Sequence, residues 1–325
     1  MKFATIAQQV EHDLCKVDVP GSIPGGGSNR VYIMILVDFN QIAIGNVMVA
    51  LNRGEELSET LVRHLILNSL RYYRSRFFEK YDELIICCDS KHYWRRDYFP
   101  NYKINRKKER ETTGYDWDVI FNCLNSIRDD LKKHFPYKVL EVYGAEADDI
   151  IATLIFNRAD KVETQKHLIL SSDKDFIQLH RYNVDQFSPV AKKMLNDKDP
   201  KNYLIEHILK GDRSDGIPNI LSPDDSFVSE IRQKPMRKVV IGNITEALER
   251  FEPDKVYQLA KCPKDTWIRN WQRNETLIDL GKIPKDIMSE ISNEYNNVEV
   301  GNRANLLTYF IEKKLTQLIN SIGDF

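Results

Sequence analysis

The chain has 325 residues, of which 42% are hydrophobic, so it is long and apolar enough for one large domain and one small one. Its 47 basic and 48 acidic residues leave a net charge of −1, which excludes a strong whole-chain field that would attract nucleic acid. Five cysteines without a C-x-x-C pair and seven histidines without paired ligand spacing argue against disulfides and zinc, and they indicate a reducing, cytoplasmic compartment.

The first 33 residues differ in character from the rest of the chain. They contain a linker-like run, Pro-Gly-Ser-Ile-Pro-Gly-Gly-Gly-Ser, at positions 20–28. No apolar stretch before this run is long enough for a signal peptide or a membrane span. We therefore predict that residues 1–33 are a non-native or disordered extension, that the native start is Met34, and that no membrane is involved.

Short apolar runs alternate with longer segments of helical spacing over the next 170 residues. Four of these runs, at positions 33–37, 84–88, 138–142 and 167–171, are typical of buried strands. Strands and helices that alternate at these lengths predict an α/β fold, with a mostly parallel central sheet covered by helices on both faces.

Acidic side chains follow the predicted strands. Parallel sheets bind ligands beyond the carboxyl ends of their strands, so these side chains are expected to meet in one crevice. They are Asp38, Asp89, Glu146, Asp148, Asp149, Asp173 and Asp175, with Asp212 and Asp215 further along the chain.

Carboxylates that meet in a cleft repel one another, and a bound cation removes that problem. Magnesium prefers hard oxygen ligands and uses few direct carboxylates per ion, so a surplus of acids indicates two ions, roughly 3.5–4 Å apart, that can hydrolyse a phosphodiester. The pattern predicts a Mg²⁺-dependent nuclease in which Mn²⁺ can substitute. Taken singly, each acid is also explained as a helix N-cap, but Glu146-Ala147-Asp148-Asp149 carries more charge than one cap needs.

The segment from 91 to 110 is basic and aromatic. It holds eight Lys or Arg and only two acids, interleaved with five aromatic residues. Basic groups neutralise phosphates and aromatic rings stack on bases, so the segment is typical of a site that handles a single strand. A charged surface loop with aromatic residues packed beneath it is the alternative interpretation.

Five motifs follow one another along the chain. They begin at Leu36-Val37-Asp38-Phe39, Ile86-Cys87-Cys88-Asp89, Tyr143-Gly144-Ala145-Glu146, Ser171-Ser172-Asp173-Lys174-Asp175-Phe176 and Lys210-Gly211-Asp212-Arg213-Ser214-Asp215-Gly216. In this order they resemble the motifs of the flap endonuclease/5′-nuclease family, and most closely those of its bacteriophage ribonuclease H branch of the T-even type. The segments Tyr93-Trp94-Arg95-Arg96-Asp97 and Arg63-His64-Leu65 add to the likeness.

The resemblance implies a PIN/5′-nuclease-like fold with three further elements. Residues 34–200 would form the catalytic α/β nuclease domain, with a basic helical arch near 91–115. Residues 201–325 would form a helix-turn-helix variant that binds DNA and a small helical C-terminal domain.

The resemblance also implies roles for single residues. Asp38, Asp89, Glu146 and Asp148 correspond to the tighter metal site, with Asp149 as a water-mediated ligand. The second site corresponds to Asp173, Asp175 and Asp215, with Asp212 close to it. Lys103 and Arg106 match positions that contact the scissile phosphate, and Arg96 is a weaker candidate for this catalytic role.

DNA-binding residues are expected in the arch and in the turn after residue 210. They are Tyr102, Lys107, Lys108, Arg213, Ser214, Gly216 and Lys234. Many family members bind a potassium ion at the turn and follow it with a second glycine-rich turn. This chain has Asn219-Ile220-Leu221-Ser222 there instead, which argues against a K⁺ site.

The expected function is that of a 5′ nuclease that removes RNA primers and flaps from duplex DNA during lagging-strand replication. Implied partners are duplex DNA with a 5′ RNA primer or flap, a single-stranded-DNA-binding protein and a sliding clamp, with a monomer as the default state. If the gene belongs to a phage, the host cytoplasm is the expected location. Two alternatives stay open: a PIN-type single-strand ribonuclease and a non-catalytic, structure-specific DNA-binding protein.

Overall fold

A central six-stranded sheet organises the part of the chain that this computed structural model describes, residues 33–159, 166–229 and 231–325. The strand order is β3-β2-β1-β4-β5-β6, and every neighbouring pair is parallel except β5 and β6. The mostly parallel sheet that we predicted is confirmed, although the sequence did not indicate the last two strands. The strands are β1 (Met34–Asp38), β2 (Glu83–Cys87), β3 (Lys138–Leu140), β4 (His167–Leu170), β5 (Val184–Ser188) and β6 (Lys193–Leu195).

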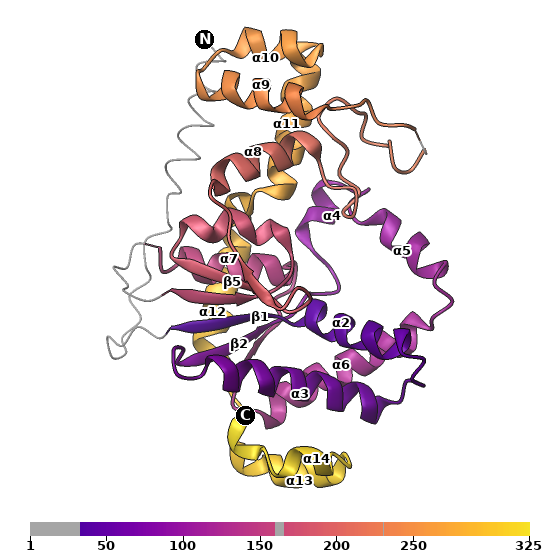
Figure 1. Cartoon of the computed structure of the whole chain (residues 1–325), viewed down its shortest axis with the longest axis vertical. Coiled ribbons are helices and arrows are strands. Elements are labelled where there is room, and N and C mark those ends of the chain that lie inside the picture. The colour runs from indigo at the N-terminus through magenta and orange to yellow at the C-terminus, as the bar shows by residue number, and fades with distance from the viewer. Residues whose placement is uncertain (1–32, 160–165, 230) are drawn as a thin grey trace.

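Helices cover both faces of the sheet (Figure 1). In β1 the side chains alternate, so Ile35 and Val37 enter one apolar cluster while Met34 and Leu36 enter another. The first cluster lies under α2 (Phe39–Asn52), α3 (Glu59–Phe77) and α6 (Trp117–His134). The second lies under α7 (Ala147–Phe156), η1 (Lys174–Arg181) and α12 (Lys285–Asn297).

Two short helices form an arch between the end of β2 and α6. These are α4 (Trp94–Tyr98) and α5 (Ile104–Glu111), and Figure 1 shows them curving away from the sheet. The base of the arch is fixed because Phe99 and Tyr102 are buried in a third apolar cluster. That cluster is shared with α8 (Pro200–Lys210), α9 (Lys238–Glu249), α10 (Pro253–Ala260) and α11 (Lys264–Ile278). The predicted helical arch is confirmed.

A tight turn follows α8. Gly211 ends the helix with φ +65°, and its backbone lies so close to Ile217 and Pro218 that a Cβ atom would approach a carbonyl oxygen to 2.3 Å. An isolated bridge between Asp212 and Ile217 closes the turn. The long connection from 218 to 229 and 231 to 237 then leads to α9.

The C-terminal segment returns to the sheet. Helix α12 packs against α7, and α13 (Leu306–Glu312), α14 (Thr316–Ile319) and the terminal Phe325 join the cluster beneath α3 and α6. The 3₁₀ turn η2 (Leu280–Lys282) lies between α11 and α12, η3 (Arg303–Asn305) lies between α12 and α13, and η4 (Ile322–Asp324) follows α14 at the end of the chain. The domain division at residue 200 stays a prediction, and the predicted extension lies outside the described residues except for Ile33. Among the described helices, none combines the length and the apolar character that crossing a bilayer requires.

Candidate metal centre

Acidic side chains meet where the carboxyl ends of the central strands lie. Asp38 is the last residue of β1, and Asp89 and Asp173 follow the neighbouring strands β2 and β4. From β1 the sheet first grows on one side, through β2 and β3, and then on the other side, through β4 and β5. The strand order therefore reverses between β1 and β4, next to Asp38 and Asp173. Ligands bind at such a point in open α/β sheets.

Hydrogen bonds fix the orientation of the carboxylates of Asp38 and Asp89. Asp38 caps α2 by accepting from the Gln41 amide, and its other oxygen accepts from the Ser171 hydroxyl at 2.9 Å. Asp89 accepts from the side-chain amide of Asn40 at 2.7 Å and from the Ala147 backbone amide at 2.8 Å. Both carboxylates are therefore held from several elements at once.

Burial and mutual repulsion make ionisation of this group unfavourable. Burial, together with the charges of Asp89 and Asp173, raises the pKa of Asp38 to about 7. The pKa of Asp148 lies well above its ordinary value because that carboxyl is buried and faces Asp173 and Asp38. Such a group needs a cation to remain ionised near neutral pH.

Two basic residues of the arch face the acids. The Lys103 ammonium pairs with Glu146 and lies 3.7 Å from an Asp215 oxygen. The Arg106 guanidinium donates to the other Asp215 oxygen at 2.6 Å. Burial alone would raise the pKa of Glu146, but Lys103 outweighs it and the pKa falls to about 2.

The backbone of Lys103 couples the arch to the turn after α8. Lys103 has φ +56°, a left-handed conformation that is uncommon outside glycine, and its amide donates to the Asp215 carbonyl at 2.7 Å. The Tyr102 hydroxyl lies 3.0 Å from a Glu146 oxygen and 2.9 Å from an Asp215 oxygen, so its single proton is shared between these two acceptors. Arch and acids are therefore positioned by the same contacts.

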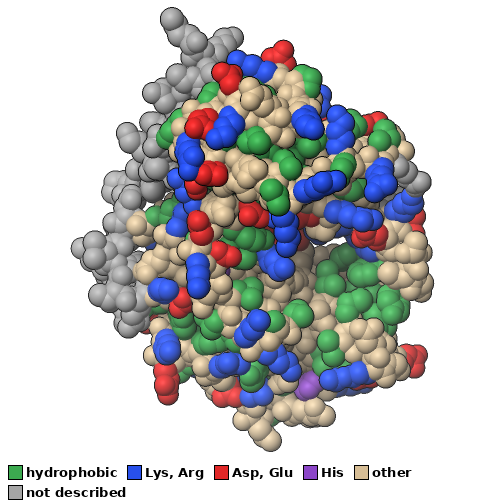
Figure 2. Space-filling view, turned by 45° about the horizontal axis from the view of Figure 1, so that its top comes forward, with side chains coloured by type: hydrophobic (Ala, Val, Ile, Leu, Met, Phe, Trp, Pro, Cys, Tyr) green, Lys and Arg blue, Asp and Glu red, His purple; other side chains and the backbone are tan. Residues whose placement is uncertain are grey.

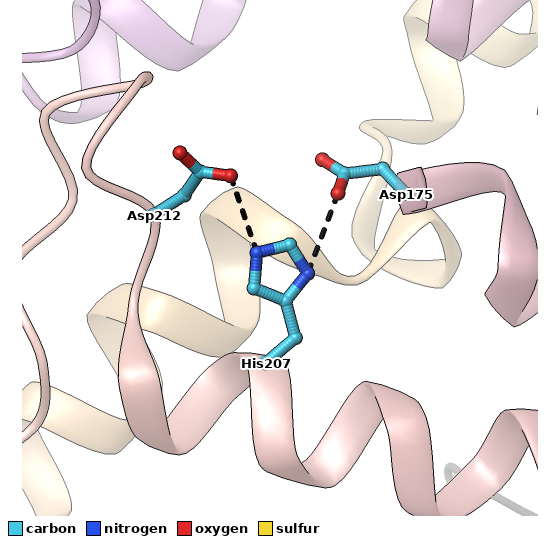
Figure 3. Close-up of side chains that lie close together, drawn as sticks. All are labelled: Asp175, His207 and Asp212. Carbon is cyan, nitrogen blue, oxygen red and sulfur yellow. Dashed lines mark hydrogen bonds and ion pairs between the residues drawn. The ribbon is translucent and has the colours of Figure 1, made fainter. Parts of the chain in front are cut away.

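A second group contains a histidine. Within the described residues, Asp175, His207 and Asp212 bring one ligand atom each to within 4.8 Å of one another (Figure 3). Burial and the charge of Asp173 raise the pKa of Asp175 to about 8. Burial would also raise the pKa of Asp212. Hydrogen bonds from His207 and Ser214 outweigh burial there, so the pKa of that carboxyl is lowered.

The donor set fits magnesium or manganese. The first group offers only carboxylate oxygens, which are the ligands that hard divalent cations prefer. In the second group, Nδ1 of His207 is buried and makes no hydrogen bond. Both observations are consistent with cations at these positions.

Asp149 lies apart from these two groups. Its side chain is fully buried, and both oxygens face Arg95, at 2.8 and 2.9 Å. The Trp94 indole also donates to it, and it accepts from the Glu146 amide. Arg95 bridges Asp149 and Glu146, which gives it a structural function that sequence reasoning did not find.

The remaining predicted residues lie in three places. Arg96 packs over the Tyr93 ring at 5.0 Å and, within the described chain, makes no contact with the acids. Arg213, Ser214 and Lys234 are exposed on the turn and the connection after α8, and Lys108 is exposed on α5. The side chain of Lys107 is outside the described part, and Gly216 is buried against Asn101. Figure 2 shows a face that is hollowed near its middle, with Lys and Arg side chains both above and below the hollow.

His207 was also missed by sequence reasoning. It projects from α8 on the side opposite Ile205 and Leu209, which are buried in the third cluster. The sequence pattern that could have identified it is a histidine on the polar face of an amphipathic helix, five residues before Asp212. That signal is weak, because only the fold brings Asp175 to the same place.

Two family descriptions match consecutive parts of the chain. The first, "5′-3′ exonuclease, N-terminal resolvase-like domain", matches residues 48–206. The second, "T4 RNase H, C terminal", matches residues 200–325.

Several known proteins with similar sequences are nucleases. Ribonuclease H of Enterobacteria phage T4 is 34% identical over 298 residues, which are 89% of this chain and 95% of that protein. A 5′-3′ exonuclease of Buchnera aphidicola is 30% identical over 44% of this chain and 51% of its own length. A flap endonuclease of Shewanella is 29% identical over 42% of this chain and 52% of its own length.

Solved structures share the fold at lower identity. A bacteriophage T5 flap endonuclease, in a pseudo-enzyme–product complex with DNA and metal ions, has a TM-score of 0.54 and 15% identity. That match covers 82% of this chain and 98% of the other. The T5 5′-exonuclease with bound zinc has a TM-score of 0.53 and 17% identity over the same shares of the two chains.

Proposed function

Because this chain belongs to the family of phage T4 ribonuclease H and is a 5′ nuclease, we propose that it removes RNA primers and 5′ flaps from duplex DNA during lagging-strand replication. The substrates would be RNA–DNA hybrids and the 5′ ends or flaps of duplex DNA. The supporting observation is the set of buried and half-buried carboxylates at the carboxyl ends of β1, β2 and β4, opposite two basic residues of the arch.

The carboxylates fall into two proposed metal positions. Asp38, Asp89 and Asp148, with Glu146 beside them, would hold the tighter Mg²⁺ or Mn²⁺ ion. Asp173, Asp175 and Asp215 would hold the second, with Asp212 close by. The ions would activate water for attack on phosphorus and stabilise the leaving oxygen. Asp149 is proposed as a positioning residue, because its carboxylate holds Arg95 against Glu146.

The protein's own groups would orient the metal ligands and bind the phosphate. Ser171 and Asn40 donate to Asp38 and Asp89, so these carboxylates keep their orientation when an ion arrives. Lys103 and Arg106, now paired with acids, would turn their charge to the scissile phosphate once cations satisfy those acids. The products would carry a 5′-phosphate and a 3′-hydroxyl, without a covalent enzyme intermediate.

Duplex DNA would contact the turn and the connection after α8. Arg213, Ser214 and Lys234 are exposed there and can reach phosphates. Basic residues of the arch, Lys107 and Lys108 among them, would contact the phosphates of the single strand.

We propose that duplex binding does not depend on potassium. Buried side-chain amides and a guanidinium already donate to carbonyl oxygens of the connection: Arg273 and Asn274 to Pro218, each at 2.9 Å, and Asn270 to Ile220 at 2.8 Å. Oxygens occupied in this way are poor ligands for K⁺. A single-stranded-DNA-binding protein and a sliding clamp remain proposed partners, a monomer the proposed state, and the host cytoplasm the proposed location.

The proposal is tested by cleavage of end-labelled substrates with and without Mg²⁺. The substrates are a 5′ flap on duplex DNA, an RNA-primed DNA duplex, the same flap blocked at its 5′ end by a bulky protein, and single-stranded RNA. We expect short 5′ products from the first two substrates, only when Mg²⁺ is present, and less product from the blocked flap.

Other outcomes distinguish the alternatives. Efficient cleavage of single-stranded RNA without a duplex would replace the proposal with a PIN-type ribonuclease. Binding of the flap without cleavage in any metal would support a non-catalytic DNA-binding role.

A further inference from the structure

His207 lies between two acids of the second group (Figure 3). Its Nδ1 atom is 3.3 Å from an Asp175 oxygen, and its Nε2 atom is 3.2 Å from an Asp212 oxygen. Asp175 comes from η1 after β4, His207 from the middle of α8 and Asp212 from the turn that follows. Three elements therefore direct ligand-forming atoms to one place.

The local structure holds these side chains in position. On α8, Tyr203 lies one turn before His207, and the two rings pack edge to face at 5.9 Å. One oxygen of Asp212 accepts from the Ser214 amide and hydroxyl and from the Asp215 amide. Its second oxygen is therefore the one that faces the imidazole. Both the ring and the carboxylate are oriented before any ligand arrives.

Ion pairs among Asp175, His207 and Asp212 leave one buried nitrogen without a hydrogen bond. Although Nδ1 of His207 is within ion-pair distance of Asp175, the contact lacks hydrogen-bond geometry, and Nδ1 is buried without another partner. A divalent cation would supply a partner for the nitrogen and a charge for the carboxylate.

We propose that His207 is a nitrogen ligand of a divalent cation bound between Asp175 and Asp212, so that this position prefers Mn²⁺ or Co²⁺ to Mg²⁺. This proposal rests on the proposed nuclease function, because the cation would be the second of the two ions of the proposed nuclease. It adds a ligand of a different chemical type, and therefore a metal preference, to that position.

The preference follows from the donors. Mg²⁺ favours an all-oxygen octahedral shell, whereas imidazole nitrogen suits later divalent ions, whose affinity rises from Mn²⁺ to Co²⁺. Only one ring nitrogen can bind the ion, and the other can donate to the remaining carboxylate oxygen, an arrangement common for ligating histidines. The all-oxygen position at Asp38, Asp89 and Asp148 offers no comparable preference among the described residues.

The test is electron spin echo envelope modulation of Mn²⁺ bound to the full chain. One equivalent of Mn²⁺ is added in the presence of millimolar Mg²⁺, to wild type, His207→Gln and His64→Gln. Glutamine keeps a polar side chain at position 207 but has no imidazole nitrogen. His64 lies on α3, away from the acids, and serves as the matched control.

We expect ¹⁴N modulation typical of a histidine ligand in wild type and in His64→Gln, and its loss in His207→Gln. Without Mg²⁺, His207→Gln should bind Mn²⁺ on the order of tenfold more weakly at this position. Bound Mn²⁺ without ¹⁴N modulation would overturn the nitrogen ligand and leave the nuclease proposal intact. Failure of the wild-type chain to bind Mn²⁺ even without Mg²⁺ would overturn both.

Discussion

Individual carboxylates in this protein are destabilised by their surroundings when no cation is bound. Asp38 is buried and Asp175 is half-buried next to other acids, and their pKa values rise to about 7 and about 8. Lys103 and Arg106 neutralise a different part of the cluster, at Glu146 and Asp215. The acids on the β1 and β4 side are therefore the ones that depend most on added metal.

Without metal, the stability of the protein should fall as pH rises from about 4 to about 8. Asp38 and Asp175 have folded-state pKa values above their unfolded values, so the folded protein holds more protons and stability is lost as pH passes through the folded values. The raised pKa of His207, where Asp212 outweighs burial, acts in the same direction. Glu146 and Asp212 have lowered pKa values, so their contribution to the stability of the folded protein is lost only at more acidic pH.

Thermal unfolding in a chelator across this pH range measures the effect. Asp38→Asn and Asp175→Asn should flatten the pH dependence and stabilise the metal-free protein at pH 8 by on the order of 1–3 kcal/mol. The exposed control Asp286→Asn should change neither. A wild-type curve without this decline would show that the acids are solvated or paired in the metal-free protein.

Residue-level chemistry was partly predictable from the sequence. Acids that follow parallel strands must lie at one edge of the sheet, so Asp38, Asp89 and Asp173 could be grouped before the fold was known. Arg95 and His207 could not, because their partners are 51 residues away at Glu146 and on η1 at Asp175. Pairing over such distances depends on tertiary packing, which spacing along the chain does not reveal.

Secondary structure elements differ in how clearly the sequence indicates them. The apolar runs of β1, β2 and β4 are buried on both faces and were recognisable. Strand β5 has the sequence Val-Asp-Gln-Phe-Ser and contains a buried polar residue, Gln186. The side-chain amide of Gln186 donates to the Ser171 and Asp173 carbonyls. Apolar periodicity cannot identify a strand in which a buried amide supports the acid-bearing loop.

The turn after α8 and the base of the arch depend on each other. Gly216 has φ +71°, and a Cβ atom there would lie 2.8 Å from the Asn101 carbonyl oxygen. Next to it, the Asp215 carbonyl accepts from the Lys103 amide. The arch can approach the acids this closely only because residue 216 has no side chain.

Gly216→Ala should therefore destabilise the protein by about 1–3 kcal/mol and reduce cleavage more than duplex binding. The left-handed backbone and the contact with the Asn101 carbonyl would displace Asp215 and Lys103 together. Unfolding curves and single-turnover cleavage of the 5′ flap measure the two effects.

Gly45→Ala is the matched control, because a Cβ atom at this position in α2 meets nothing within 4 Å. It should leave cleavage unchanged and stabilise the protein by up to about 1 kcal/mol. Equal behaviour of the two variants would contradict the proposed coupling between turn and arch.

At the scale of the whole molecule, the C-terminal segment ties the sheet and its helices together. The buried Arg63 of α3 donates to the Tyr309 hydroxyl of α13 at 2.7 Å and pairs with Asp130 of α6. Phe325, the last residue, packs against Phe135 with ring centroids 5.5 Å apart. The family resemblance implied a helical C-terminal domain, but not that its last helices return to the face of the sheet beneath α3 and α6.

The arch contacts the acids through two basic residues. Lys103 and Arg106 bring positive charge to a cluster of buried carboxylates, and the hollowed face in Figure 2 lies beside a surface rich in Lys and Arg. Net charge is nearly zero, so this local separation of charge, rather than a whole-chain field, would guide a phosphate to the acids.

The central claim is that the buried acids hold the ions that cleave the substrate. It is tested most directly by Asp148→Asn in single-turnover cleavage of an RNA-primed duplex, with binding of the same duplex measured in Ca²⁺ and with Asp286→Asn as control. We predict unchanged or tighter binding and a loss of cleavage on the order of a thousandfold, about 4 kcal/mol, in Asp148→Asn alone. Cleavage by Asp148→Asn at the rate of the control would contradict the account.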